Sequence, residues 1–255
     1  MKYVEYSVSK KFEDIIQNYW KFEILEDKKL HFPIKHETLP ENTISLVLIN
    51  QPYFNGIRLL GPHIKSYNQT LMFNSIFFGI KFQPWVTIRQ LTPDKTLILN
   101  LTSDVPENIK NYFSSLINHK TLKPGFNNIK TIEKSTQKLL KEVAIETNDM
   151  VKFICLQLNL GKTISEIVKQ IPASIRVIQK QFKKVTGITM KQYASINRQR
   201  NTWRAILSNN QKQIDALLDN GYFDQSHFIN EFKKNMTQSP SNFKTYLSSV
   251  DMVFK

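Results

Sequence analysis

The feature that most constrains the fold of this chain is an internal repeat in its second half, with an offset of 50 residues. The segment that begins at Ser174 aligns with the segment that begins at Asp224, and both residue types favour the N-cap of a helix. Apolar residues follow four and eight positions after each cap, which places them on one stripe of a helix. The other aligned pairs are Ile178 with Phe228, Phe182 with Phe232, Lys183-Lys184 with Lys233-Lys234, Thr189 with Ser239 and Tyr193 with Phe243. The sequence therefore predicts the same capped, amphipathic helix twice.

A shorter helical segment precedes each predicted helix, over residues 164–170 and 214–220. The connecting turns contain the helix breakers Pro172 and Gly221. A helix, a short turn and a capped second helix together make a helix-turn-helix unit, although two ordinary helical hairpins are the alternative. The predicted units cover about residues 164–184 and 214–234, and a linker helix over residues 194–207 joins them.

The charge of the chain is placed unevenly. Its net charge is +14, and residues 151–255 hold 16 Lys and Arg against 6 Asp and Glu, whereas residues 1–150 hold 19 against 15. A basic excess on one part of a protein favours a polyanionic partner such as nucleic acid, with a solvated lysine-rich surface as the alternative. No run of 18 apolar residues and no signal-peptide pattern occurs, so we expect a cytoplasmic protein without a membrane partner.

The polar face of each capped helix supplies candidates for DNA contacts. In the major groove, Arg and Lys pair with guanine, and Gln and Asn pair with adenine. The candidates for base contacts are Arg176, Gln179 and Lys180 in the first unit and Gln225, Ser226, His227 and Asn230 in the second. The candidates for phosphate contacts, which position a protein without specifying sequence, are Lys183, Lys184, Lys233 and Lys234. A solvated polar face is the alternative for each of them.

The first half of the chain is predicted to be mostly β-structure. Apolar, β-rich runs separated by turn residues indicate a small antiparallel barrel or sandwich over residues 30–101. The expected strands cover residues 43–49, 56–60, 87–91 and 96–101, and residues 71–82 are expected to form one long strand or a hairpin. Helices are expected near residues 12–19, where Phe12, Ile15, Ile16 and Tyr19 are spaced for one, and over residues 107–117 and 131–149.

The residue patterns of common enzymes are missing from the sequence. It contains no GxSxG, P-loop or GxGxxG motif, and its one cysteine, Cys155, excludes an intramolecular disulfide and a cysteine-based zinc cluster. His31 and His36 are five residues apart, which does not suit adjacent metal ligands on one strand face, and His63 and His119 are the remaining histidines of this half. We therefore expect no enzyme, no cofactor and no metal. The candidates for the lining of a ligand pocket are Phe77, Phe78, Phe82 and Trp85, for which burial in the core is the more frequent alternative.

The second unit carries a specific motif. Its residues are Gly221-Tyr222, Asp224, Ser226, Phe228, Phe232-Lys233 and Ser239-Pro240. This pattern resembles the signature of the AraC/XylS family of bacterial transcription regulators, and the first unit matches through Ser174, Phe182, Lys183, Gly187, Tyr193 and Arg198. Thr237 stands where the family has glycine, so we expect a different turn there. A weaker similarity to the sensor domains of a subgroup rests on Tyr19-Trp20, Gly61-Pro62 and residues 79–84.

The resemblance implies sequence-specific binding to double-stranded DNA, control by a small-molecule effector or partner of the first domain, and contact with RNA polymerase. We predict an α+β chain in which residues 1–148 form a cupin-like sensor domain and residues 149–255 form an all-α DNA-binding domain of seven helices. A homodimer is compatible with this organisation. The alternatives are a small-molecule-binding, cupin-like protein whose basic domain no longer reads sequence, and a non-specific nucleic-acid binder, which would bind all sequences equally.

Overall fold

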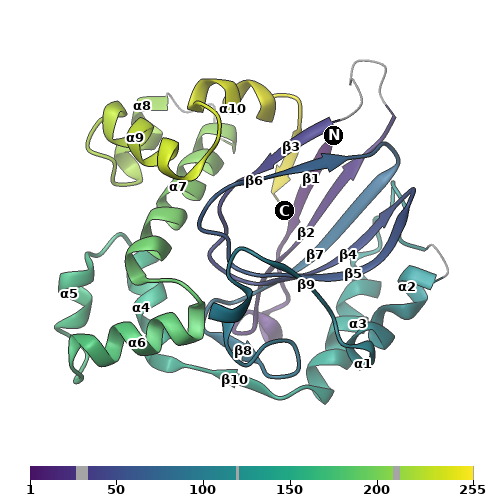
Figure 1. Cartoon of the computed structure of the whole chain (residues 1–255), viewed down its shortest axis with the longest axis horizontal. Helices are drawn as coiled ribbons and strands as arrows, with labels where there is room; N and C mark the ends of the chain where they lie inside the picture. Colours follow the sequence, from purple (N-terminus) through teal and green to yellow (C-terminus); the bar gives the residue numbers. More distant parts are fainter. Residues whose placement is uncertain (27–33, 119–120, 209–212, 255) are drawn as a thin grey trace.

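The structure, a computed structural model, describes residues 1–26, 34–118, 121–208 and 213–254 (Figure 1). His31 and His119 lie outside these residues. The strands are β1 (Lys2–Tyr6), β2 (Ile16–Ile24), β3 (Ile34–Thr38), β4 (Ser45–Gln51), β5 (Phe54–Leu60), β6 (Tyr67–Leu71), β7 (Ser75–Phe82), β8 (Val86–Ile88), β9 (Thr102–Asp104), β10 (Ile145–Thr147) and β11 (Asp251–Phe254). The α-helices are α1 (Glu107–Lys110), α2 (Ser114–Asn118), α3 (Ile129–Glu142), α4 (Asp149–Asn159), α5 (Ile164–Val168), α6 (Ile175–Thr186), α7 (Met190–Ser208), α8 (Gln213–Asp219), α9 (Gln225–Asn235) and α10 (Pro240–Leu247).

A seven-stranded sheet organises the first half of the chain, with the strand order β11-β1-β2-β7-β4-β5-β9. All neighbouring strands are antiparallel except β1 and β11, which run parallel with Lys2 opposite Asp251. Two further strand pairs, β3 with β6 and β8 with β10, complete the β-structure. The predicted mostly-β first domain is therefore confirmed, and its sheet is extended by a parallel edge strand from the far end of the chain.

The two faces of this sheet pack against different layers. Phe78 on β7 lies in the main hydrophobic core together with Leu139 of α3, and Figure 1 shows α1, α2 and α3 on this side of the sheet. Phe77, its neighbour on the same strand, packs in a separate cluster with Ile34 of β3 and Leu71 of β6. Side chains alternate between the faces of a strand, and the core face of β7 is entirely apolar (Ile76, Phe78, Ile80 and Phe82), whereas the other face carries Ser75, Phe77, Gly79 and Lys81. All eight of its residues are buried.

One glycine of β7 permits a close contact across the sheet. Gly79 pairs with Trp20 on β2. A Cβ atom on Gly79 would lie 1.9 Å from the indole carbon Cε2 of Trp20, closer than any real contact. The indole ring therefore lies across the strand because residue 79 has no side chain.

The helix expected over residues 12–19 is wrong. A single 3₁₀ turn, η1 (Lys10–Phe12), precedes the strand β2, which contains Ile16 and Tyr19. The pairing of β2 with β7 shifts between Ile16 and Asn18, which is a β-bulge at this point. Because a bulge inserts one extra residue, two side chains three apart face the same core, and their spacing imitates a helix.

Two expected strands also differ from the structure. Residues 71–82 form neither one strand nor a hairpin, because β6 pairs with β3 whereas β7 pairs with β2 and β4. Asn74 adopts a left-handed conformation (φ 57°) in the turn between them. The strand expected at 96–101 is mostly a 3₁₀ helix, η2 (Lys95–Ile98), because the Asp94 carboxylate accepts hydrogen bonds from the backbone N–H and the hydroxyl of Thr96 at 2.8 and 2.6 Å.

The second half of the chain is helical up to its last strand. Within the described residues, seven helices (α4 to α10) follow one another, as the sequence predicted. The helix expected over 131–149 ends earlier, because α3 stops at Glu142 and the strand β10 intervenes before Asn148 caps α4. In the part of the chain that the structure describes, no helix has the length and apolar character needed to cross a bilayer.

Candidate nucleic-acid interface and ligand pocket

The first unit consists of α5 and α6, and the cap of α6 sets which side chains it exposes. The Ser174 hydroxyl accepts a hydrogen bond from the backbone N–H of Val177 at 3.4 Å, which is the predicted N-cap. Ile178 and Phe182 are completely buried, as predicted. The opposite face is exposed and holds the candidate side chains Arg176, Gln179, Lys180, Lys183 and Lys184. The structure therefore presents the predicted set together on one side of α6.

The second unit repeats this arrangement with α8 and α9. The Asp224 carboxylate accepts a hydrogen bond from the backbone N–H of His227 at 2.7 Å, and Phe228 and Phe232 are completely buried. The exposed candidates on α9 are Gln225, Ser226, His227, Asn230, Lys233 and Lys234. His227 is partly engaged, because its Nδ1 accepts from the N–H of Phe223 at 3.3 Å.

An acidic residue that the sequence reasoning missed fixes α9 on the linker helix α7. The Glu231 carboxylate lies 2.8 Å from the Arg198 guanidinium and accepts hydrogen bonds from the hydroxyls of Ser195 at 3.0 Å and Tyr222 at 3.1 Å. Glu231 is the one acidic residue of α9, and this isolated acidic residue in a basic helix is the sequence signal that could have identified it. This network determines how the second recognition helix is oriented on α7.

The turn after α9 differs from the family pattern and contacts the sensor domain. Thr237 is not among the residues with positive φ, and the chain leaves α9 at Met236 in an extended conformation. The backbone N–H and the hydroxyl of Thr237 both donate to Glu37 of β3, at 2.7 and 2.8 Å. The expectation of an altered turn at this position is met, and the turn ties the second unit to β3 of the first domain.

Helix α6 also contacts the sensor domain. Gly187 ends α6 in the left-handed conformation (φ 83°), and a Cβ atom there would lie 2.9 Å from the carbonyl oxygen of Lys95. The Lys95 ammonium is buried and donates to the carbonyl of Pro84 at 2.9 Å. Burial lowers the pKa of Lys95 to about 7. Both helix-turn-helix units therefore contact the first domain.

A cavity of about 280 Å³ lies between the sheet and the helical region. Its walls come from β1, β2, β3, β4 and β7 on one side and from α7 and α10 on the other. Apolar and aromatic side chains make up much of the lining: Trp20, Phe22, Val47, Ile49, Leu60, Phe77, Trp203, Phe243 and Leu247. Its volume is close to the lower end of the range of small-molecule sites, which begins at about 300 Å³.

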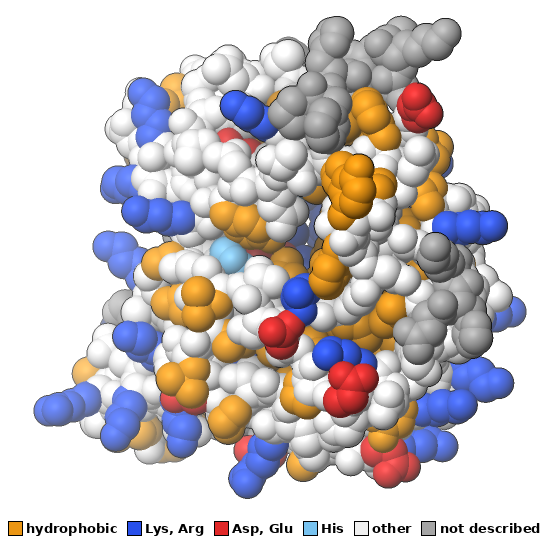
Figure 2. All heavy atoms as spheres, turned by 45° about the vertical axis from the view of Figure 1, so that its right-hand side comes forward, with side chains coloured by type: hydrophobic (Ala, Val, Ile, Leu, Met, Phe, Trp, Pro, Cys, Tyr) orange, Lys and Arg blue, Asp and Glu red, His pale blue; other side chains and the backbone are white. Residues whose placement is uncertain are grey.

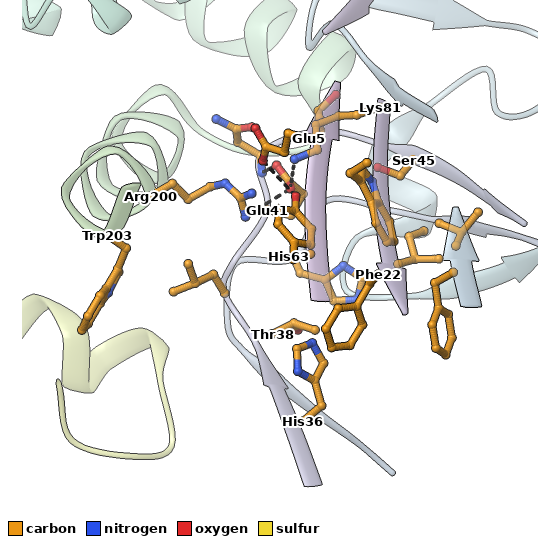
Figure 3. A pocket seen from close by; sticks show the side chains of 18 of the residues that line it. Glu5, Phe22, His36, Thr38, Glu41, Ser45, His63, Lys81, Arg200 and Trp203 are labelled. Atoms are coloured by element: carbon orange, nitrogen blue, oxygen red, sulfur yellow. Dashed lines mark hydrogen bonds and ion pairs between the residues drawn. The ribbon is translucent and has the colours of Figure 1, made fainter. Parts of the chain in front are cut away.

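Charged side chains gather at one end of this cavity, as Figure 3 shows. The Lys81 ammonium of β7 lies 2.6 Å from the Glu41 carboxylate, and the Arg200 guanidinium of α7 lies 3.2 Å from the same carboxylate. Arg204, one turn further along α7, pairs with Glu5 of β1. Among the described residues that line the cavity, three cations therefore meet two carboxylates at this end, which leaves one positive charge in excess.

Burial and the neighbouring charges together set the pKa values of these groups. It lowers the pKa of Lys81 below the usual value of lysine, although Glu41 opposes the shift. Burial would raise the pKa of Glu41, but the charges of Arg200 and Lys81 outweigh it and hold this pKa below the usual range. Glu41 is therefore ionised between two cations, and each cation faces the cavity.

Three further titratable residues of the lining, His36, Glu37 and His63, have shifted pKa values. Burial lowers the pKa of His36 to about 4, and it also lowers the pKa of His63. Glu37 accepts hydrogen bonds from Ser66 and Thr237, which hold its pKa below the usual range even though burial opposes them. The two histidines are neutral, and the Glu37 carboxylate is already engaged by Ser66 and Thr237. The end of the cavity that contains Lys81 is therefore the place where an anionic group would bind.

The predicted pocket residues divide between this cavity and the core. Phe77 lines the cavity, as expected. Phe78, Phe82 and Trp85 do not line it and pack in the main core, where each is at most 4% exposed. Phe78 and Phe82 differ from Phe77 in strand parity, so their side chains point to the other face of β7. Lys81 was not among the residues predicted from the sequence. The signal that could have identified it is the presence of a lysine in an otherwise mostly apolar strand.

Lys and Arg side chains crowd the left-hand edge of the molecule in Figure 2, the side on which Figure 1 shows the helical region.

Within the described residues, no group of three or more His, Cys, Asp and Glu side chains could hold a metal ion.

Comparisons with known proteins agree with this geometry. Residues 167–246 match the family model of a helix-turn-helix domain. Residues 167–246 are an AraC-type helix-turn-helix domain. The chain is thus a DNA-binding transcription regulator with a mostly-β first domain. No curated protein sequence matches the chain.

Three structures of ToxT from Vibrio cholerae share the fold of the regulator. A 1.65 Å structure has 13% sequence identity and a TM-score of 0.50, and the match covers 89% of this chain and 96% of ToxT. An apo ToxT variant has 12% identity and a TM-score of 0.51, over 88% of this chain and 96% of that one. ToxT bound to (E)-4-(8-methylnaphthalen-1-yl)but-3-enoic acid has 13% identity and a TM-score of 0.51, over 92% and 98%. At these identities, the likeness concerns the fold.

Proposed function

We propose that this regulator reads two blocks of bases with α6 and α9, and that an apolar carboxylic acid bound in the cavity controls the reading. The observation that carries the second part is the excess positive charge at the end of an apolar cavity, between the sensor sheet and the helix that joins both recognition units. The DNA part and the ligand part are tested separately.

For the DNA part, the exposed face of each recognition helix supports a division of labour. Arg176, Gln179, Lys180, Gln225, Ser226, His227 and Asn230 would contact bases, and Lys183, Lys184, Lys233 and Lys234 would contact phosphates. The bases are read near the N-terminal end of a recognition helix, whereas both lysine pairs lie in the last turn.

We expect Arg176→Ala to weaken binding to the preferred duplex by about 1–3 kcal/mol and to relax the preference at one or two base pairs. Lys184→Ala should weaken binding to all sequences alike and reduce the salt slope by about one. The measurement is a titration of selected and mismatched duplexes at several salt concentrations, after selection from random DNA. Identical behaviour of the two variants across the mismatches would contradict the assignment of faces, and equal wild-type affinity for all duplexes would favour the non-specific binder.

For the ligand part, the physical argument rests on the uncompensated charge. An ionic group out of water is costly unless a counter-charge or hydrogen bonds compensate it. A ligand carboxylate that contacted Lys81 and Arg200 in addition to Glu41, which already bridges them, would balance the excess charge, and the apolar body of the ligand would lie against the aromatic lining. ToxT, which shares the fold, has been captured with an apolar carboxylic acid, which supports the same ligand class here.

Such a ligand would join the sensor sheet to α7, because Lys81 belongs to β7 and Arg200 to α7. Helix α7 lies between the two recognition units, so the acid would restrict how α6 and α9 adjust to successive grooves. A ligand shifts an equilibrium only by its differential affinity for the two states, which are here the free protein and the DNA-bound protein. We therefore expect the bound acid to lower the affinity for DNA.

The ligand experiment uses the acid found in ToxT and its methyl ester. Calorimetry should show binding of the acid, and the ester, which lacks the charge, should bind roughly tenfold more weakly. Lys81→Met should lose the preference for the acid over the ester. Lys110→Met is the matched control, because Lys110 pairs with Glu107 at 3.0 Å on α1, away from the cavity. Equal binding of acid and ester by the wild type would refute the proposed site, and a thermal melt would show whether Lys81→Met remains folded.

We also propose the division into residues 1–148 and 149–255. The boundary falls between β10 and α4, where the Asn148 side chain accepts from the N–H of Val151 at 3.0 Å and starts α4. The strand β11 crosses this division, because it pairs with β1. A contact with RNA polymerase, a homodimer, a cytoplasmic location and the lack of enzymatic activity stay predictions.

A further inference from the structure

An aromatic side chain at the tip of the second unit has no place in the core. Phe223 is 87% exposed and directly precedes Asp224, the N-cap of α9. Its neighbour Tyr222 is only 2% exposed, and the Tyr222 ring meets the Phe228 ring edge-on at 5.1 Å between centroids. The core of the unit is thus complete without Phe223, and the exposed ring gains no burial in the free protein.

The backbone at Phe223 is held in place. Gly221 turns the chain in a left-handed conformation (φ 78°), and its N–H donates to the carbonyl of Leu218 at 2.9 Å. The N–H of Phe223 donates to the Nδ1 atom of His227 at 3.3 Å, and the Asp224 carboxylate caps the helix at the next residue. The exposed ring is therefore presented from a fixed point rather than from a loose loop.

This point lies beside the base-reading face of α9. The exposed side chains that follow are Gln225, Ser226, His227 and Asn230, and α9 has no Lys or Arg before Lys233. Amide side chains pair with adenine, and the thymine of the same base pair presents its C5-methyl group in the same groove. A phenylalanine beside amide side chains therefore favours an A·T pair, because contact between the apolar ring and the thymine methyl group is favourable.

We propose that Phe223 contacts the C5-methyl group of a thymine in the block read by α9, and thereby makes that block selective for A·T pairs. The proposal rests on the DNA-binding activity of the chain and not on the ligand cavity. The first unit has Ala173 at the position aligned with Phe223, so the contact belongs to the second block alone.

The experiment replaces thymine by uracil, which removes only the methyl group. A duplex selected from random DNA by the full-length protein is resynthesised with uracil at one thymine at a time. Replacing one thymine of the second block by uracil should lower the affinity of the wild-type protein about three- to fivefold. This is the change expected when one buried methyl group, which contributes about 0.8 kcal/mol, is removed. Phe223→Ala should bind the unmodified duplex roughly tenfold more weakly and be insensitive to uracil at that thymine. Phe223→Leu, which stays apolar, should keep the sensitivity.

Tyr53 provides the matched control, since it is also 87% exposed but lies in the turn between β4 and β5 of the sensor domain. Tyr53→Ala should respond to uracil as wild type does. The proposal is overturned if wild type and Phe223→Ala show the same uracil profile, or if Phe223→Ala binds DNA normally and loses only transcriptional activity, which would assign the ring to a protein partner. A wild-type protein with no sequence preference would overturn the reading of bases as a whole, so the two failures are distinguishable.

Discussion

At the scale of single residues, His36 connects β3 of the first domain to α10 of the helical region. Its Nδ1 shares a hydrogen bond with the hydroxyl of Tyr246 on α10, and its ring stacks on Phe22 at 4.9 Å between centroids. Burial lowers the pKa of His36 to about 4, with Glu37 opposing the shift. The folded protein therefore holds a neutral imidazole at a pH where the unfolded chain, with an ordinary pKa near about 6.5, is already protonated.

The sign of the resulting pH dependence follows from linkage. The stabilisation that comes from the neutral imidazole of His36 is fully present above pH ~6.5. It falls as the pH drops, because the unfolded chain binds the proton first, and the decline levels off below pH ~4. The loss amounts to up to about 3 kcal/mol for this group. Urea unfolding at a series of pH values should show that decline in wild type and a smaller one in His36→Gln. His63, whose pKa burial also lowers, adds a decline of the same sign in both proteins. Equal declines in the two proteins would show that His36 titrates normally.

At the scale of elements, the length of α7 limits how the two units can bind DNA. The helix spans 19 residues, five more than the linker predicted from the sequence, and is about 28 Å long at 1.5 Å per residue. Successive major grooves on one face of DNA lie about 34 Å apart, so the helix and the width of its neighbours can place α6 and α9 in adjacent grooves. A monomer should therefore recognise an asymmetric site with two blocks about one turn apart.

Insertions between the two blocks test this limit. Inserting about 5 base pairs should reduce affinity nearly to that of one block, because one block turns to the opposite face of the duplex. Inserting about 10 base pairs should not restore it, because a helix cannot stretch. Gel-shift titrations with the three spacings would measure both effects. Equal affinity for the native and 5-pair spacings would mean that only one unit engages DNA.

The elements that the sequence predicted well are those with local determinants. The caps at Ser174 and Asp224 and the apolar residues at the fourth and eighth positions define α6 and α9 without help from the rest of the chain. The β-bulge in β2 was unpredictable from spacing alone, since it gives Ile16 and Tyr19 a helical interval. The 3₁₀ helix η2 depends on one capping side chain inside an apolar run.

The cavity could not be predicted for a different reason. Its charged end brings together Glu5, Glu41, Lys81 and Arg200, which are separated by tens of residues or more along the chain and meet only through the strand order of the sheet and the packing of α7. The aromatic candidates divide between the cavity and the core because strand parity, which decides the face that a side chain joins, depends on register. Phe77 and Phe78 show that one step along β7 separates a pocket wall from the core.

At the scale of the whole molecule, the two domains are joined at several separate points. Glu37 bonds to Thr237, Arg200 to the carbonyl of Pro40 at 3.1 Å, and β11 to β1. These contacts connect the second unit to β3, α7 to the segment after β3, and the strand β11 to the seven-stranded sheet, while η2 contacts α6 of the first unit. A change in the sheet therefore has a direct mechanical connection to each recognition helix.

The pairing of β1 with β11 also has a consequence during biosynthesis. The ribosome makes β1 first and β11 almost 250 residues later, since Lys2 pairs with Asp251. At about 5–20 residues per second, the interval is on the order of 10–50 s. Throughout that time the outer edge of β1 has unpaired backbone groups, which can template association with another nascent chain. The strand that closes this edge is thus made long after β1, and a translation product that stopped before β11 would keep the edge open.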